Sequence, residues 1–271
     1  MTPMPAPECP IGIFDSGLGG LTVARALIDL LPAEDFVYFG DTGRFPYGPK
    51  PADEVLKYSL EIADFLVEHS VKMLVVACNS ASAVALDALR ERLDIPVVGV
   101  IEPGVRAARD ATRSGRVGVI GTVGTISSGA YQRAAAVLAE GVTLTCAACP
   151  GFVEFVEAGD VDSDQVHVLA ERLLAPVIAA QVDTLVLGCT HYPLLSRTIT
   201  DVMGPDVVLV SSAEETAFEV RDRLYQHDGV RSSATAVAHR FVTSGVVEQF
   251  LTLGARFLGP EVESVESWRW S

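Results

Sequence analysis

Two short stretches of the sequence are nearly alike, and each joins a strand-like apolar run to a cysteine. Residues 75–80 read VVACNS and residues 186–191 read VLGCTH. In parallel α/β sheets, reactive groups lie at the carboxyl ends of buried strands, just before a helix begins. We therefore expect Cys78 and Cys189 to face one ligand from opposite sides. Such a pair of thiols suits a reaction that removes a proton from one face of a carbon atom and returns it to the other.

Alternating apolar runs and helical segments predict the fold class. Continuous apolar runs predict buried strands over residues 11–14, 36–39, 73–77, 97–100, 117–120, 142–146 and 184–187. Amphipathic helices are expected between them, the longest over residues 52–69, 81–93 and 163–180. This alternation is typical of parallel sheets that are covered by helices on both faces. The predicted fold class is therefore α/β.

An internal repeat predicts two similar halves. The interval from Asp15 to Cys78 is nearly repeated between Thr122 and the second cysteine. Such a repeat indicates two parallel-sheet α/β domains, with the active site in the cleft between them. The segment after Ser211 begins with a capping-box pattern, contains one more strand-like run and is too short for a third domain. We expect the first domain to comprise residues 1–98 and 211–271, and the second to comprise residues 99–210.

The composition narrows the class of protein. A chain of 271 residues, 49% of them hydrophobic, can bury a large core. Its net charge of −15 disfavours binding to nucleic acids and to anionic membrane surfaces. The proline-rich start, Met1–Pro10, lacks the basic region of a signal peptide, and no other segment is apolar over the length of a membrane span. Five cysteines, an odd number, indicate reduced thiols and a cytoplasmic protein.

The two cysteines can act as acid and base. A thiolate is a competent base near neutral pH, and the N–H groups of a helix N-terminus favour its negative charge. Asn79 and Ser80 can cap the helix that follows Cys78. His191 lies close enough to Cys189 to poise its thiol or to take part in proton transfer. The alternative is that both cysteines are buried and inert.

Three loops at expected strand ends could bind a ligand. Residues 15–20, DSGLGG, permit close backbone approach but match neither the G-x-G-x-x-G pattern nor a P-loop. Asp15 could accept a hydrogen bond from an ammonium group, tune a nearby thiol, or cap a helix. Residues 40–48 and 121–125 can present backbone N–H groups and hydroxyls to an anion. The C-x-x-C run over 146–149 permits a redox or metal role, although no second ligand pair accompanies it.

Several motifs, in this order, resemble those of the aspartate/glutamate racemase family and, within it, of the glutamate racemases. They are Gly12-Ile13-Phe14-Asp15-Ser16-Gly17-Leu18-Gly19-Gly20, Asp41 with Pro46-Tyr47-Gly48, Cys78-Asn79-Ser80-Ala81, Gly121-Thr122 with Ser128 and Tyr131, and Gly188-Cys189-Thr190-His191-Tyr192-Pro193-Leu194-Leu195. The resemblance implies an isomerase of two α/β domains that interconverts L- and D-glutamate without a cofactor. It also implies that the product supplies D-glutamate for peptidoglycan in the cytoplasm.

The resemblance implies a role for each matching position. Cys78 and Cys189 resemble the two acid/base thiols, the first acting on D-glutamate and the second on L-glutamate. Asp15 and His191 resemble their respective assistants. The chain departs from the family pattern at Ser80, where threonine is common, but the hydroxyl is retained. The residues that resemble a substrate cradle are Asp15, Ser16, Tyr47, Gly48, Asn79, Ser80, Thr122, Thr190, His191 and Glu157.

A racemase without a cofactor places two demands on its site. Because the α-proton of an amino acid is weakly acidic, placed hydrogen-bond donors must stabilise an enediolate-like transition state. One thiol must be ionised while the other stays protonated. We expect glutamate as the small-molecule substrate, no cofactor or metal, no nucleic-acid or membrane partner, and a homodimer. Two alternatives remain open: an aspartate racemase or another member of the same superfamily, and a regulatory protein on this fold that has lost catalysis.

Overall fold

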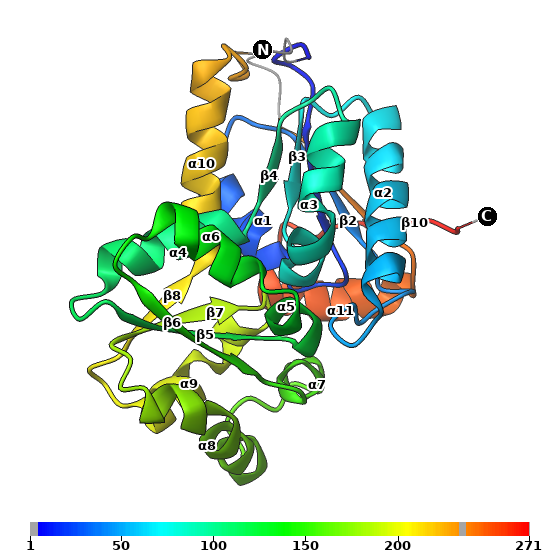
Figure 1. Ribbon diagram of the computed structural model, residues 1–271. Helices are drawn as coiled ribbons and strands as arrows, with labels where there is room; N and C mark the ends of the chain where they lie inside the picture. The colour runs from blue at the N-terminus through cyan, green and yellow to red at the C-terminus, as the bar shows by residue number, and fades with distance from the viewer. Residues whose placement is uncertain (1–4, 233–236, 271) are drawn as a thin grey trace.

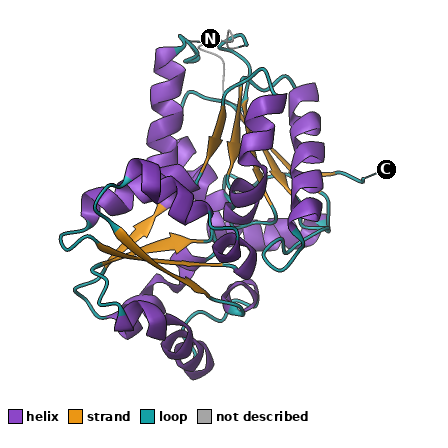
Figure 2. Cartoon of the chain, in the orientation of Figure 1, coloured by secondary structure: helices purple, strands orange, loops and turns teal. Residues whose placement is uncertain are grey.

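The computed structural model describes residues 5–232 and 237–270, which form two parallel β-sheets enclosed by helices (Figure 1, Figure 2). The first sheet has the order β10-β9-β2-β1-β3-β4, with β1 (Ile11–Asp15), β2 (Phe36–Gly40), β3 (Met73–Val76), β4 (Val97–Gly99), β9 (His239–Thr243) and β10 (Glu266–Ser267). The second has the order β6-β5-β7-β8, with β5 (Arg116–Gly121), β6 (Thr143–Ala148), β7 (Thr184–Gly188) and β8 (Val208–Ser211). Each paired strand runs parallel to its neighbour, so the predicted α/β class is confirmed.

The two sheets share one topology. In each sheet the first strand of the half is central, the second strand pairs on one side of it, and the third and fourth lie on the other side. The orders β2-β1-β3-β4 and β6-β5-β7-β8 are therefore equivalent, which confirms two similar halves. In each half the chain changes direction across the sheet between the first and third strands. A position where the chain changes direction in this way is called a switch point, and ligands of open α/β sheets bind there, outside the carboxyl ends of the strands.

Helices cover both faces of the first sheet. Leu27, Val220 and Phe250 are buried against one face, whereas Ile62 and Leu89 are buried against the other. The buried positions of the longest helix recur at helical spacing, which is why its sequence predicts it well. The helices are α1 (Leu21–Leu30), α10 (Ser212–Gln226) and α11 (Val247–Phe257) on the first face, and α2 (Ala52–Glu68) and α3 (Asn79–Arg92) on the second.

The second sheet is covered in the same way. One face carries α4 (Ile101–Ala111) and α6 (Ala130–Leu138). The other carries α7 (Phe152–Glu157), α8 (Asp164–Ala179), the 3₁₀ helix η1 (Tyr192–Leu195) and α9 (Ser196–Met203). A short helix, α5 (Val123–Ser127), lies after β5 and contacts α3 of the first half. This contact brings the carboxyl ends of the two sheets together (Figure 1).

The sequence predicts most of the buried strands and the longest helices, but not α4. α4 contains Pro103 and Gly104, which disfavour an isolated helix, and it forms because Ile101, Val105 and Ala108 are buried against neighbouring elements. In the segment after residue 211, α10, β9, α11 and β10 all pack on or extend the first sheet. Among the helices of the described ranges, none combines the length and apolar character that a membrane span requires.

Candidate active site

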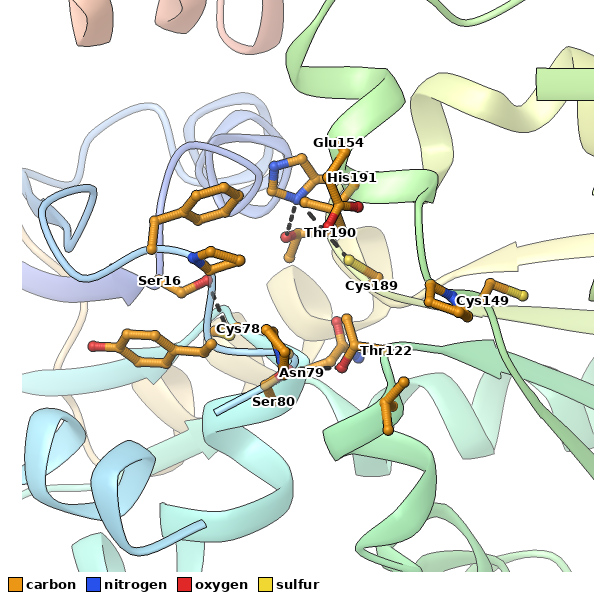
Figure 3. Close-up of a pocket in the computed structure, with 18 of the residues that line it drawn as sticks. Ser16, Cys78, Asn79, Ser80, Thr122, Cys149, Glu154, Cys189, Thr190 and His191 are labelled. Atoms are coloured by element: carbon orange, nitrogen blue, oxygen red, sulfur yellow. Dashed lines mark hydrogen bonds between the residues drawn. The ribbon is translucent and has the colours of Figure 1, made fainter. Parts of the chain in front are cut away.

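A cavity lies between the two halves, at the carboxyl ends of both sheets, and together with its opening to solvent it contains about 620 Å³ of empty space (Figure 3). Figure 3 shows Cys78 and Cys189 entering it from different halves of the chain. The predicted cleft between two domains is therefore present. Of the residues expected to act as thiols, assistants or substrate contacts, those that line this cavity are Ser16, Tyr47, Gly48, Cys78, Asn79, Ser80, Thr122, Cys189, Thr190 and His191. Asp15 and Glu157 lie outside its wall, each beside a residue of the wall.

Cys78 follows β3 and caps the N-terminus of α3 with its own sulfur. The sulfur accepts a hydrogen bond from the Ala81 N–H at 3.5 Å, and the thiol donates to the Ser16 hydroxyl at 3.6 Å. Burial, reinforced by the negative charge of Asp15, raises the pKa of the Cys78 thiol to about 12. At neutral pH Cys78 is therefore a protonated thiol, able to donate a proton to a ligand in the cavity.

Cys189 follows β7 at the equivalent place and has an imidazole beside it. The Cys189 sulfur is 4.0 Å from His191 Nδ1, and His191 Nε2 is 2.7 Å from a carboxylate oxygen of Glu157. Burial alone would lower the pKa of His191, but its bonds to Cys189 and Glu157 outweigh burial and raise the pKa to about 10. His191 is therefore an imidazolium at neutral pH. Its positive charge stabilises negative charge on a neighbouring sulfur.

Asp15 lies at the end of β1, fully buried behind the wall of the cavity. One carboxylate oxygen accepts from the Gly17 N–H at 3.0 Å, and the other has no hydrogen-bond partner among the described residues. Burial raises the pKa of Asp15, and the nearby charge of His191 opposes this increase. Asp15 does not cap α1, whose N-cap residue is Gly20. The position of Asp15 fits a residue that tunes the Cys78 thiol rather than a helix cap.

The glycine-rich loop allows the two halves to approach each other at His191. A Cβ atom at Gly19 would lie 2.3 Å from the Thr190 hydroxyl and 2.5 Å from His191 Nδ1, so only glycine fits there. The imidazole is further flanked by the rings of Phe45 and Phe257, with centroids 5.8 and 5.7 Å away. Gly19, Phe45 and Phe257 all belong to the half of the chain that contains the first sheet. Residues of the first half therefore pack around His191, which belongs to the second half.

Hydroxyl and amide groups of both halves meet near the cysteines. The Ser80 hydroxyl lies 3.0 Å from that of Thr122 and 3.2 Å from that of Thr125. Asn79 Nδ2 donates to the Tyr131 hydroxyl at 2.9 Å, while its buried Oδ1 has no partner among the described residues. The prediction that Asn79 and Ser80 cap the helix is wrong, because the sulfur of the preceding cysteine occupies that place. Both residues instead line the cavity, and Asn79 Oδ1 remains without a partner among the described residues.

The loop between β2 and α2 forms another part of the wall. The Tyr47 hydroxyl points to Asp41, to which it donates a short hydrogen bond, so its ring and backbone rather than its hydroxyl face the cavity. The Gly48 carbonyl accepts from the Gly124 N–H of the second half at 2.9 Å. A Cβ atom at Gly48 would lie 2.7 Å from Cβ of Thr122. The absence of a side chain at Gly48 therefore permits this contact between halves.

Further residues of the wall carry no sequence signal of their own. Phe45 and Val123 line the cavity as members of the predicted ligand loops, residues 40–48 and 121–125, and not through their own side-chain chemistry. Val153 and Glu154 lie outside these loops, and only the position of Glu154, one turn before Glu157 on α7, could have indicated its place. Phe45 and Val153 are ordinary apolar residues in pattern and chemistry. Their role in the wall depends on the relative placement of the two sheets, which no local pattern encodes.

The C-x-x-C run does not form a redox pair. Cys149 is buried in the cluster on one face of the second sheet and lines the cavity, whereas Cys146 packs with the cluster on the other face. Both are free thiols. In the part of the chain that the structure describes, no group of three His, Cys, Asp or Glu residues could hold a metal ion.

The cavity has little positive charge for binding an anion. Its wall, within the described residues, contains no lysine or arginine, and its cationic side chain is His191. A carboxylate ligand would therefore depend on hydroxyls, amides and backbone N–H groups, together with this single imidazolium. Glu154 is the acidic residue of the wall and is exposed to solvent.

Two thiols at equivalent strand ends, sharing one cavity with opposite electrostatic surroundings, define the class of enzyme that moves a proton between the two faces of a carbon atom. The chain belongs to the Asp/Glu/Hydantoin racemase family, whose model matches residues 12–219. It is an isomerase of the racemase type.

Within that family the chain is similar to glutamate racemases. It is 54% identical to the glutamate racemase of Mycobacterium leprae, over 98% of each chain. The structure of a Bacillus anthracis glutamate racemase isoform superimposes with a TM-score of 0.90 at 44% identity, covering 97% of each chain. That of the Francisella tularensis glutamate racemase in complex with D-glutamate gives 0.91 at 33% identity, covering 97% of this chain and 98% of the other.

Proposed function

We propose that the protein interconverts L- and D-glutamate, with Cys78 and Cys189 as the two acid/base groups. The observation that carries this proposal is that both sulfurs open on one cavity from equivalent strand ends of the two halves. The similarity to glutamate racemases over nearly the whole chain supports glutamate as the substrate.

In the proposed reaction the Cys189 thiolate removes the α-proton of L-glutamate. The Cys78 thiol then donates its proton to the opposite face, which gives D-glutamate. The roles are exchanged in the reverse direction. The charges of the free site favour the first arrangement, because the pKa of Cys78 is raised to about 12 whereas Cys189 has an imidazolium beside it. The site is therefore prepared to receive L-glutamate.

The proton leaves carbon only if the negative charge that develops on the α-carboxylate is stabilised. The hydroxyls of Ser80, Thr122 and Thr190, with the Asn79 amide, are the proposed hydrogen-bond partners. The imidazolium of His191 adds a positive charge in a site that is largely closed to water. Preorganised donors of this kind stabilise a developing oxyanion more strongly than water does.

Closure of the two halves over the substrate would complete the site. We assign residues 1–98 and 211–271 to one domain and residues 99–210 to the other; the separate sheets support this division to within one residue, because β4 of the first sheet ends at Gly99 and β8 of the second ends at Ser211. The contacts of Gly19 and Gly48 with the second half lie directly at the cavity. Relative movement of the domains would therefore open and close the wall and exclude water during proton transfer.

The proposed cellular role is the supply of D-glutamate for peptidoglycan in the cytoplasm, by a homodimer. The net charge of −15 supports a small-molecule substrate without nucleic-acid or membrane partners. The substrate proposal is tested against its aspartate alternative by incubating the protein with L-glutamate or L-aspartate, without added cofactor, and following optical rotation. Loss of optical activity with aspartate but not with glutamate would refute the substrate assignment. Loss with neither would favour the regulatory alternative.

The roles of the two thiols are tested by substitution. Cys78→Ala and Cys189→Ala should each reduce racemisation by at least about 10³-fold, because general acid–base groups contribute on that order. Cys146→Ala is the matched control, since this free cysteine packs away from the cavity and should leave the rate unchanged. Racemisation near the parent rate in either of the first two variants would contradict the mechanism.

Isotope incorporation tests the two-sided transfer. In D₂O the D-glutamate formed first should carry solvent deuterium at Cα, because the proton that is added comes from a different thiol than the one that removed it. The remaining L-glutamate should stay largely unlabelled early in the reaction. Retention of the original hydrogen in the product would exclude transfer by two separate groups.

A further inference from the structure

The carboxylate of Asp41 connects the C-terminal tail to the loop at the cavity. Asp41 follows β2 and is fully buried. Two of its hydrogen bonds come from its own loop, from Arg44 Nε at 2.7 Å and from the Tyr47 hydroxyl. Two more come from the C-terminal part of the chain, from the Ser244 hydroxyl at 2.6 Å and from Trp270 Nε1 at 3.1 Å. One buried group therefore joins segments that are far apart in sequence.

Trp270 also contacts the loop through its ring. The guanidinium carbon of Arg44 lies 3.8 Å from the centroid of the Trp270 indole and 4.0 Å from that of the Tyr58 ring, so the cation is held between two aromatic faces. Arg44 also pairs with Glu61 of α2. A guanidinium stacked between two rings is attracted electrostatically to both, and its freedom of movement is small. The indole of Trp270 therefore holds the loop through two contacts: its N–H donates to Asp41, and its ring face packs on the Arg44 guanidinium.

The loop held by these contacts carries five consecutive residues of the cavity wall. Residues 45–49 line the cavity, and the Gly48 carbonyl is held on the far side by the Gly124 N–H of the second half. On the side of the first sheet, the Asp41 group of bonds holds Tyr47 through its hydroxyl. Since that hydroxyl is used for Asp41, Tyr47 can affect a ligand only through the position of its ring and backbone. That position depends on the Asp41 bonds.

We propose that Trp270 is a positioning residue for substrate binding, acting through Asp41 and Arg44 on the Tyr47-Gly48 part of the wall. The inference rests on the proposed function, because Tyr47 and Gly48 are assigned there to the substrate cradle. Within the described residues, the hydrogen bond and ring contacts of Trp270 join it to Asp41, Arg44, Phe39 and Trp268 and not to either active-site cysteine. Its loss should weaken the binding of substrate and leave proton transfer between the thiols intact.

The chain offers a matched control, because both of its tryptophans lie in this tail. The Trp268 ring packs on Phe65 with centroids 4.6 Å apart, but its buried indole N–H has no partner among the described residues. The Trp268 ring also lies beside that of Trp270, with centroids 6.2 Å apart, so Trp268→Phe removes an indole from the same tail, keeps a ring beside Trp270, and leaves the contacts of Trp270 with Asp41 and Arg44 in place. Trp270→Phe removes the bond to Asp41 but keeps a ring over Arg44, whereas Trp270→Ala removes both.

The experiment measures KM and kcat of the full-length variants with L- and D-glutamate, together with their melting temperatures. We expect KM to rise about threefold in Trp270→Phe and about tenfold in Trp270→Ala, with kcat within about twofold of the parent. Trp268→Phe should keep the parent KM. The KM effect of Trp270→Phe should be much smaller in a Tyr47→Phe background, because the same path is already broken.

Two results would overturn the inference. One is a parent-like KM in Trp270→Ala when the parent racemises glutamate. The other is a fall in kcat with unchanged KM and a lowered melting temperature, which would indicate a structural role alone. A parent protein that does not racemise glutamate would refute the proposed function itself, so the two failures are distinguishable.

Discussion

Glu157 helps to keep His191 protonated, and this can be tested by removing the negative charge of Glu157 while keeping its shape. The carboxylate oxygen lies 2.7 Å from His191 Nε2, and the histidine side chain is 3% exposed against 24% for the glutamate. In Glu157→Gln the amide oxygen can still accept the same hydrogen bond from His191. The change therefore affects mainly the electrostatic attraction between the carboxylate and the imidazolium.

The expected magnitude follows from the pKa of His191. The increase of that pKa from 6.5 to about 10 corresponds to about 5 kcal/mol in favour of the protonated ring. Bonds to Cys189 and Glu157, and the charges of Cys189 and Asp15, share this stabilisation against the opposing effect of burial. Glutamine keeps a hydrogen bond to the ring but loses the carboxylate charge that strengthens it, and Glu157 is partly exposed, so we expect the substitution to weaken protonation of His191 by about 1.5 kcal/mol. The ring should therefore bind its proton about tenfold more weakly in Glu157→Gln.

The measurement is an NMR titration of the His191 ring in the two proteins. The folded pKa lies above that of an ordinary histidine, so the imidazolium persists through neutral pH and is lost as the pH rises through about 10. In Glu157→Gln this loss should begin about one pH unit lower. Glu154→Gln is the matched control: it neutralises a carboxylate of the same helix for which no bond to His191 is found, and should leave the midpoint unchanged. An unchanged midpoint in Glu157→Gln would refute this account of the charge of His191.

Two further predictions concern packing and acid stability. Gly48→Ala should reduce kcat/KM at least about tenfold, because the new methyl group would lie 2.7 Å from Cβ of Thr122. Gly254→Ala is the control and should leave kcat/KM unchanged, because its methyl group would make only ordinary contacts, at 3.5 Å or more. Asp183→Asn should destabilise the fold by about 1–2 kcal/mol in urea at pH 7, because bonds from Thr112, Arg113 and Ser114 hold the Asp183 carboxylate. These bonds outweigh burial and lower the pKa of Asp183, so its stabilisation is present above about pH 4 and lost as the pH falls, and the two proteins should converge in stability in acid. A parent-like kcat/KM in Gly48→Ala would contradict the first prediction, and equal stability of the parent and Asp183→Asn in urea at pH 7 would contradict the second.

The sequence predicts those parts of the fold in which one local pattern is sufficient. β1, β3, β5 and β7 are continuous apolar runs that are buried on both faces of a sheet, and the sequence shows them clearly. α4 and α6 are different, because they are short and their apolar positions gain stability only from the sheet and from each other. The presence of two similar halves could be predicted because both halves place similar polar residues after the same strands, whereas the shared strand order is seen only in the structure.

The site is predicted in part for the same reason. The sequence predicts Cys78 and Cys189 because each directly follows an apolar strand-like run, and residues next to them in sequence also line the cavity. The sequence does not predict that Asp41 joins its loop to the C-terminal tail, because its partner Trp270 is far away in sequence. The cap at α3 is mispredicted because propensity favours asparagine and serine, whereas a cysteine sulfur makes the bond.

The two sulfurs have different electrostatic surroundings, but thermodynamics limits the effect of this difference on the reaction. L- and D-glutamate have equal free energies in solution, so kcat/KM must be the same in both directions for any variant. The pKa of about 12 for Cys78 and the imidazolium beside Cys189 therefore cannot favour one product at equilibrium. They can only decide which protonation form of the free enzyme predominates, and hence which enantiomer meets a site that is ready to act. Removing the charge of Glu157 should accordingly lower kcat/KM equally for both enantiomers while changing their separate kcat and KM values unequally. A fall in kcat/KM for one enantiomer alone would show that the assayed process is not a simple racemisation.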